Sequence, residues 1–293
     1  MSLETLAIQA AVGLVNAMLL FLVASGLSLI FGVSRIINFA HGSFYMLGAY
    51  GVFAMTQLAP GRPGWLLLAV GVAALGVAAA GTLVETTFLR RVYASEELFQ
   101  LLATFAVVLA VSDAVKIVWG SQNKSLPLPP FYRQTTTIFG QPFPVYYFLV
   151  LLLAGVVMVG LWFLVYRTGW GIRVRACTDD RDMANAIGIN QRRFTTTVFL
   201  LGSGLAGLGG VCAAIMGTIT PIMDSDMLVE AFVVVVVGGL GSLLGSFVAA
   251  LVVGELKAIA ILFFPRSSMV IAFLLMAVIL IVKPSGLFGA AEE

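Results

Sequence analysis

The sequence is built from long stretches that carry no charged side chain. A membrane-spanning helix needs about 20 consecutive, mostly apolar residues, and each of these stretches is long enough. Only 10% of the residues are charged, whereas soluble domains average about 25%, so the charges are too few to cover a water-soluble globule. We therefore expect an all-α polytopic membrane protein. Its charge-free stretches are 5–34, 63–84, 134–166, 194–223 and 231–254, and 36–61 is interrupted only by His41.

These stretches predict about eight transmembrane helices, plus a possible glycine-rich segment that breaks or re-enters. Gly238, Gly239, Gly241 and Gly245 interrupt the apolar run at 231–254. Interrupted apolar segments often mark broken helices near a substrate path, but small residues also permit close helix packing, and both interpretations stay open. The predicted spans are 5–34, 36–58, 65–84, 98–119, 145–166, 194–220, 231–254 and 267–282.

Basic residues are concentrated in the segments that alternation of the spans places on one side. The loop at about 167–194 holds six arginines, and Arg35, Arg90 and Arg91 fall on the same side. Short loops rich in Lys and Arg stay in the cytoplasm, so the N-terminus is predicted outside and this loop inside. The extracytoplasmic loop at about 120–144 contains four prolines before residue 143, and these disfavour helix. It is either an ordered cap or a simple surface loop.

Polar residues gather between the first two spans. Asn38, His41 and Ser43 stand between apolar runs, and polar groups at membrane depth usually face a cavity or another helix. Gly42 makes a break in helicity plausible here. His41 is either a proton-relay residue or a helix-capping, structural histidine. No carboxylate accompanies it in this segment, and this favours the structural role.

The arginine-rich loop contains a predicted short helix at 179–187. Asp179 and Asp180 suit a helix N-terminus, and Gly188 offers a C-terminal stop. Such an amphipathic helix could dock in a groove on a soluble partner or lie on the membrane surface. The apolar residues at helical spacing on one side are Met183, Ala184, Ala186 and Ile187.

Charges in or near the predicted spans are few. Asp113 and Lys116 are three residues apart and are predicted to pair on one helix face. Glu255 and Lys257 are two apart, so each needs another partner. Ion-coupled carriers usually hold carboxylates inside the membrane, and only Asp113 and Glu255 qualify as candidates. Energy supplied by another subunit is therefore favoured over an ion gradient.

Several other classes of function are excluded. One histidine and two cysteines give no metal-ligand cluster, and no HExxH, GxSxG or GxxxxGK[ST] motif occurs. We therefore expect no enzyme, no metal site and no ATP bound through a P-loop by this chain. The net charge of +2 gives no basic face for nucleic acid.

Three segments resemble the permease subunits of high-affinity branched-chain amino-acid ABC importers. They are GLSLIFGVSRIINFAHGSFYMLGAY at 26–50, VRACTDDRDMANAIGIN at 174–190 and VVVGGLGSLLGSFVAALVVGELK at 235–257. The similarity covers nearly the whole chain, in the family's order. It implies one permease transmembrane domain over 1–293, in the cytoplasmic membrane of a prokaryote. By this resemblance, the coupling helix that docks into an ATPase comprises Asp179, Asp182, Met183, Ala184, Ala186, Ile187 and Gly188.

The resemblance also implies partners and a mechanism. Such permeases pair with a second, related permease, two cytoplasmic ATP-binding subunits and an extracytoplasmic binding protein, and they work by alternating access. ATP and Mg²⁺ would then belong to the partners, with no cofactor on this chain. Asn38, His41 and Ser43 are the expected path residues. The substrate stays open between branched-chain amino acids and urea, short amides or aromatic and other carboxylates; a stand-alone gradient-driven carrier and a non-transporting scaffold are further alternatives.

Overall fold

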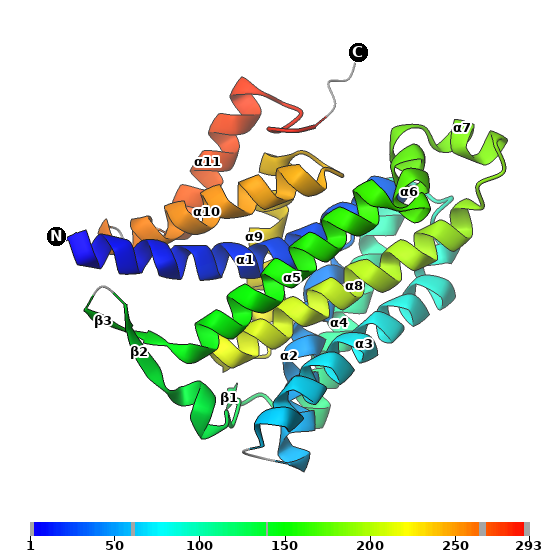
Figure 1. Ribbon diagram of the computed structural model, residues 1–293. Coiled ribbons are helices and arrows are strands. Elements are labelled where there is room, and N and C mark those ends of the chain that lie inside the picture. The colour runs from blue at the N-terminus through cyan, green and yellow to red at the C-terminus, as the bar shows by residue number, and fades with distance from the viewer. Residues whose placement is uncertain (1–2, 60–61, 139, 264–267, 290–293) are drawn as a thin grey trace.

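The chain folds into a bundle of long helices (Figure 1). The computed structural model describes residues 3–59, 62–138, 140–263 and 268–289. Within them the α-helices are α1 Leu3–Ser34, α2 Ala40–Leu58, α3 Pro63–Thr87, α4 Glu97–Trp119, α5 Val145–Arg167, α6 Gly169–Asp179, α7 Arg181–Ala186, α8 Gln191–Met216, α9 Met223–Gly238, α10 Leu243–Phe263 and α11 Ser268–Val282. The predicted all-α polytopic membrane fold is confirmed.

Six of the described helices are long and apolar enough to cross a membrane: α1, α3 with the residues that follow it, α4, α5, α8 and α10. The sequence predicted about eight spans, but only six of the described helices have the length and apolar composition to cross a membrane. The segment predicted at 36–58 begins later, as α2, and α11 is a shorter apolar helix of 15 residues. Position 267, where the last span was predicted to begin, lies outside the described residues.

The apolar run predicted at 231–254 is two helices, not one. α9 ends at Gly238 and α10 begins at Leu243. Between them Gly239 and Gly241 adopt φ values of 100° and 82°, a left-handed conformation that residues with a Cβ rarely adopt. Of the two interpretations left open for this run, the broken helix is therefore the one observed, and Gly239 and Gly241 form the break.

The other glycines predicted to break helices instead bring helices close together. Gly42 lies inside α2, where a Cβ would overlap the Asp224 carbonyl of α9. Gly238 and Gly245 face each other across the α9–α10 turn, and a Cβ on either would meet the backbone of the other. At these three positions the glycines serve close helix packing, the other use of small residues that the sequence left open.

Helices α1 and α8 form the centre of the bundle. In each, 78% of the most apolar window is buried, against 11% in α4 and 22% in α5, which lie at the periphery. Backbone-to-backbone contacts hold the centre together: Gly26 of α1 packs on Gly202 of α8, and Gly48 of α2 packs on Gly207. Peripheral faces that expose leucine, valine and phenylalanine suit a lipid environment, where no water competes for contact.

The described residues of the loop at 120–144 form short strands and a 3-10 helix. Strand β1 (Lys124–Ser125) pairs antiparallel with β4 (Thr218–Ile219), and β2 (Thr135–Ile138) pairs antiparallel with β3 (Gln141–Pro144). A 3-10 helix, η2 (Pro130–Arg133), precedes this hairpin and buries Tyr132. In Figure 1 the hairpin lies at the N-terminal end of α1, opposite the end that carries α6 and α7.

The arginine-bearing connections meet at that opposite end. Arg35, just after α1, donates to the Thr178 carbonyl of α6 over 3.4 Å. The short 3-10 helix η1 (Leu89–Arg91) contacts α8 there through Arg90 and Thr196. The connections predicted to share the cytoplasmic side therefore lie at one end of the bundle.

This arrangement predicts which positions a membrane-impermeant thiol reagent reaches. A cysteine at exposed Asp182 should react only from the cytoplasm, and one at exposed Thr136 of β2 only from outside. The native Cys177 and Cys212 are buried and serve as the unlabelled background. Labelling in intact and opened cells measures both positions, and the reverse pattern would invert the assigned topology.

Candidate functional site

The chain leaves helical geometry directly after α1. Ser34 ends the helix, and its hydroxyl donates to the Ile30 carbonyl at 2.7 Å and lies 3.3 Å from the amide nitrogen of Ile36, which donates to it. Arg35 has a φ of 53°, which costs a side chain with a Cβ about 1–2 kcal/mol. This left-handed residue reverses the chain, and residues 36–39 return towards the bundle interior without helical structure.

The start of α2 lies beside the middle of α1, not beside its end. The His41 Nε2 atom is 2.9 Å from the Val23 carbonyl oxygen. Val23 stands about 16 Å before the end of α1, at about 1.5 Å per residue. The non-helical segment therefore lies at depth within the bundle, where irregular backbone is tolerated only if protein buries it or it lines a water-filled cavity.

His41 ties two helices together. A carbonyl oxygen only accepts, so Nε2 carries the hydrogen and donates to Val23. This bond joins α2 to α1, and Phe39, at the N-cap of α2, makes no side-chain capping bond. A structural role is therefore supported, but not as a cap of its own helix. Nδ1, left as an acceptor, has no partner among the described residues.

The three predicted path residues are all buried with unpartnered polar atoms. Asn38, His41 and Ser43 are at most 1% exposed. Both amide atoms of Asn38 and the Ser43 hydroxyl have no hydrogen-bond partner in the described part of the chain. The structure brings Asn38 and His41 together, because the His41 amide donates to the Asn38 carbonyl over 3.2 Å. Each unmade bond at a buried polar group costs about 1–3 kcal/mol, so such a cluster calls for a functional explanation.

The arginine-rich loop holds two helices, of which the sequence predicted one. The unpredicted α6 begins after Thr168, whose hydroxyl accepts from the Gly171 amide at 3.2 Å. Asp179 is the last residue of α6 and not the start of the next helix. Asp180 is the N-cap of α7, and its carboxylate accepts from the amides of Asp182 at 3.0 Å and Met183 at 2.9 Å.

The predicted C-terminal stop of α7 is confirmed. Gly188 has a φ of 87°, and its amide donates to the Asn185 carbonyl. The Ile189 amide donates to the Ala184 carbonyl. The sequence predicted that Ala184 shares one side with Met183 and Ile187. This is wrong, because Ala184 is only 3% exposed and packs inwards. The side chains of Met183, in α7, and Ile187, at its C-cap, are 60% and 67% exposed and present apolar surface to the outside.

A charged cluster that sequence reasoning missed joins α3 to α8. Glu85 is fully buried, and Arg90 donates to it through Nε at 3.2 Å and Nη2 at 2.9 Å. Thr196, near the start of α8, donates its hydroxyl to Glu85 over 2.9 Å, and the Tyr93 hydroxyl lies 3.3 Å from it. The sequence signal that could have revealed this cluster was Glu85 at the end of an apolar span, five residues before Arg90.

The other predicted pairings are resolved as well. Asp113 and Lys116 form the expected ion pair, at 3.6 Å and largely exposed. Lys257 pairs with Glu230 of α9, so it does find a partner other than Glu255.

No disulfide joins Cys177 and Cys212. The described residues contain no group of three His, Cys, Asp or Glu side chains that could hold a metal ion.

Comparison with known proteins identifies the family. The family model described as "Branched-chain amino acid transport system / permease component" matches residues 9–281. The high-affinity branched-chain amino acid transport system permease protein BraD of Pseudomonas aeruginosa is 30% identical over 92% of each chain. The corresponding protein LivH of Escherichia coli K12 is 28% identical over 92% of this chain and 91% of its own.

A further relative is also named as a permease of such a system. LivM of Escherichia coli K12 is 26% identical over 92% of this chain and 68% of its own. The family match includes both the polar break after α1 and the loop that carries α6 and α7. The chain is a multi-pass membrane protein that belongs to the branched-chain amino acid transport system permease family.

Proposed function

We propose that the chain is the permease subunit of an ABC importer that moves branched-chain amino acids into the cell. The observation that carries this proposal is the family match over 9–281 together with relatives that are named for this transport. The location is the cytoplasmic membrane of a prokaryote, and one transmembrane domain over 1–293 forms the path. The chain itself catalyses no reaction and binds no cofactor.

The energy source belongs to partner subunits. A second, related permease completes the path, two cytoplasmic ATP-binding subunits hold ATP and Mg²⁺, and an extracytoplasmic protein delivers the substrate. The exposed Met183 and Ile187 of α7 support the docking role, because amphipathic helices bind by placing apolar anchors in a groove. ATP-driven closure of the ATPases would move α7 and open the spans alternately to each side.

Asn38, His41 and Ser43 are proposed to border the substrate path. A zwitterion that crosses the membrane needs hydrogen-bonding groups at depth, because its charges are costly to desolvate. Unpartnered polar atoms in buried positions can supply them transiently, to the substrate or to water that accompanies it. The His41 bond to Val23 holds the start of α2 in place beside this path.

Replacing Asn38 with leucine separates a path role from a structural one. If Asn38 serves only transport, Asn38→Leu removes two unpartnered buried polar atoms and should raise the thermal unfolding midpoint, while uptake falls by about tenfold or more. Ser25, whose hydroxyl donates to the Leu22 carbonyl at 3.0 Å, provides the matched control. Ser25→Ala should leave uptake near wild type. An Asn38→Leu protein with full uptake would exclude this residue from the path.

Reconstitution tests the proposal as a whole. The chain, its partner permease and the ATPases are placed in proteoliposomes with ATP inside and the binding protein outside. Labelled leucine should accumulate only with ATP and all subunits. Accumulation of urea, an amide or an aromatic acid instead would reassign the substrate. Uptake by the chain alone along an ion gradient would replace the ABC importer with a secondary carrier.

A further inference from the structure

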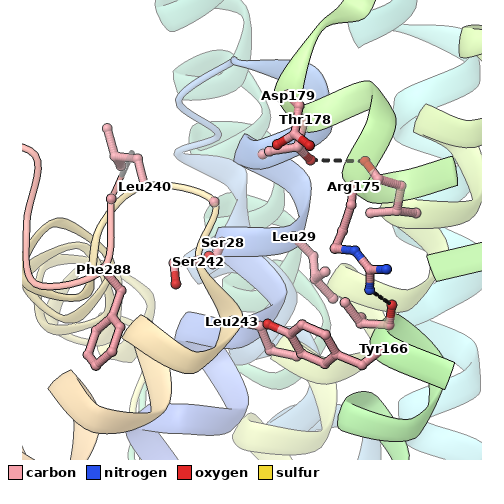
Figure 2. Close-up of a pocket in the computed structure, with 15 residues that line it drawn as sticks. Ser28, Leu29, Tyr166, Arg175, Thr178, Asp179, Leu240, Ser242, Leu243 and Phe288 are labelled. Atoms are coloured by element: carbon pink, nitrogen blue, oxygen red, sulfur yellow. Dashed lines mark hydrogen bonds between the residues drawn. The ribbon is translucent and has the colours of Figure 1, made fainter. Parts of the chain in front are cut away.

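A cavity lined by both polar and apolar side chains lies at the cytoplasmic end of the bundle. It has a volume of about 240 Å³ and lies between the C-terminal part of α1, the α5–α6 junction, the α9–α10 turn and the segment after α11 (Figure 2). It is distinct from the Asn38–His41 break, which contributes none of its lining. Its polar lining residues are Ser28, Tyr166, Arg175, Thr178, Asp179 and Ser242.

Opposite charges line this cavity. Arg175 and Asp179 stand one helical turn apart on α6, yet no ion pair joins them. The Arg175 guanidinium donates to the Val165 carbonyl and lies 5.2 Å above the Tyr166 ring. A guanidinium carries five N–H donors, so this anchoring leaves donors for an anionic group. Asp179 offers a carboxylate to a cationic one.

Ser28 provides an independent indication of a ligand. Serines in helices commonly donate to the carbonyl one turn earlier, as Ser34 does to Ile30 at 2.7 Å. Ser28, on the same helix, is 1% exposed, lines the cavity and has no hydrogen-bond partner among the described residues. Its hydroxyl therefore stands buried and without a partner in the wall of the cavity.

The rest of the lining consists of three glycines and six apolar side chains: Gly32, Gly241, Gly289, Leu29, Val165, Val174, Leu240, Leu243 and Phe288. The volume lies below the roughly 300–1,000 Å³ of sites for drug-sized ligands. A small molecule with one positive group, one negative group and an apolar body matches this combination. We propose that the cavity binds a zwitterionic aliphatic amino acid from the cytoplasm and thereby slows uptake, an inference that rests on the proposed function.

The walls of the cavity explain how such a ligand would act. Asp179 immediately precedes Asp180, the N-cap of α7, so the cavity adjoins the proposed coupling helix. The segment after α11 is bonded to the end of α9, with the Leu287 amide 2.8 Å from the Val237 carbonyl. A ligand that bridges α1, α6 and the α9–α10 turn favours the conformation in which they are close. It would thus oppose any transport step that separates them.

Uptake into vesicles that are loaded with different solutes tests this inference. Reconstituted transporter is loaded internally with L-leucine, with 3-methylbutylamine, which lacks the carboxylate, or with 4-methylpentanoate, which lacks the ammonium group. Internal leucine at saturation should slow the initial uptake of labelled isoleucine at least about twofold, and the two analogues should not. Equal inhibition by all three compounds, or by none, would overturn the inference.

Two variants locate the effect. Arg175→Gln removes the charge and leaves a shorter, neutral amide, and Ser28→Val replaces the unpartnered hydroxyl with a methyl group. Both should lose inhibition by internal leucine and still take up isoleucine into leucine-free vesicles. Arg173→Gln, at an exposed position on the same helix, should keep the inhibition.

The outcomes separate this inference from the proposed function. Normal uptake into leucine-free vesicles with inhibition retained in both variants would overturn the cavity assignment alone. If the wild-type complex takes up no isoleucine or leucine under any loading, the proposed function itself fails, and the regulatory role fails with it.

Discussion

Met183→Asp combined with Ile187→Lys is expected to abolish ATP-driven uptake while the chain still folds and inserts. Both side chains are exposed, Met183 within α7 and Ile187 at its C-cap. Interface anchors cost about 2 kcal/mol or more when removed, so the loss of each should weaken ATPase binding about 30-fold. Aspartate near the N-terminus and lysine near the C-terminus of α7 favour the helix dipole, so the helix itself should persist.

Uptake in proteoliposomes and co-purification of the ATPase subunits measure this effect. Ile172→Asp is the matched control, because Ile172 is 60% exposed on the neighbouring α6 and aspartate also suits its place in the first turn of that helix. The control should retain both uptake and the ATPases. A double variant with intact complex and full uptake would remove α7 from the coupling role.

The sequence was most informative where one local property decides the structure. Long apolar runs predicted the membrane helices, since span length follows from bilayer thickness. Gly188 was predicted to stop α7, and its φ of 87° is the conformation that glycine favours there. Arginine-rich connections were predicted on one side, and they meet at one end of the bundle.

Features that depend on contacts between distant segments could not be predicted. Glycines at Gly42 and Gly239 look alike in sequence, yet the first packs against the Asp224 carbonyl and the second turns the chain. Only the neighbouring helix decides between these uses. The depth at which α2 begins likewise follows from the His41 contact with Val23, and no local pattern specifies how far the chain returns after Arg35.

α6 and the Glu85 cluster were missed for different reasons. Two of the first three residues of α6 are glycines, so its local helix preference is weak, and packing of Gly171 on the backbone of α5 stabilises it. In the sequence, Glu85 stands at the end of an apolar span, where a charged residue is expected at the membrane–water interface and not in the protein interior. Its complete burial depends on Thr196, which lies far along the chain in α8.

Glu85→Ala is expected to be among the most destabilising single changes outside the glycine contacts. Removing one partner of a buried ion pair leaves the other charge uncompensated and costs about 3–5 kcal/mol. The lower end applies here, because the Arg90 side chain is 34% exposed. Asp113→Ala breaks a pair whose side chains are 73% and 43% exposed, so it should cost at most about 1 kcal/mol. Thermal unfolding of the purified protein in detergent compares the two.

Replacing both Glu85 and Arg90 tests whether the ion pair itself stabilises the protein, or whether only a single unpaired charge destabilises it. Glu85→Met with Arg90→Met should recover most of the stability that Glu85→Ala loses, because apolar replacement of a buried pair is often neutral. Uptake should not recover with it, because the cluster joins the end of α3 to the start of α8, directly after the loop that carries α7. A double variant that is stable and hydrolyses ATP but transports poorly would show that the cluster transmits motion. Full recovery of uptake would limit the cluster to a structural role.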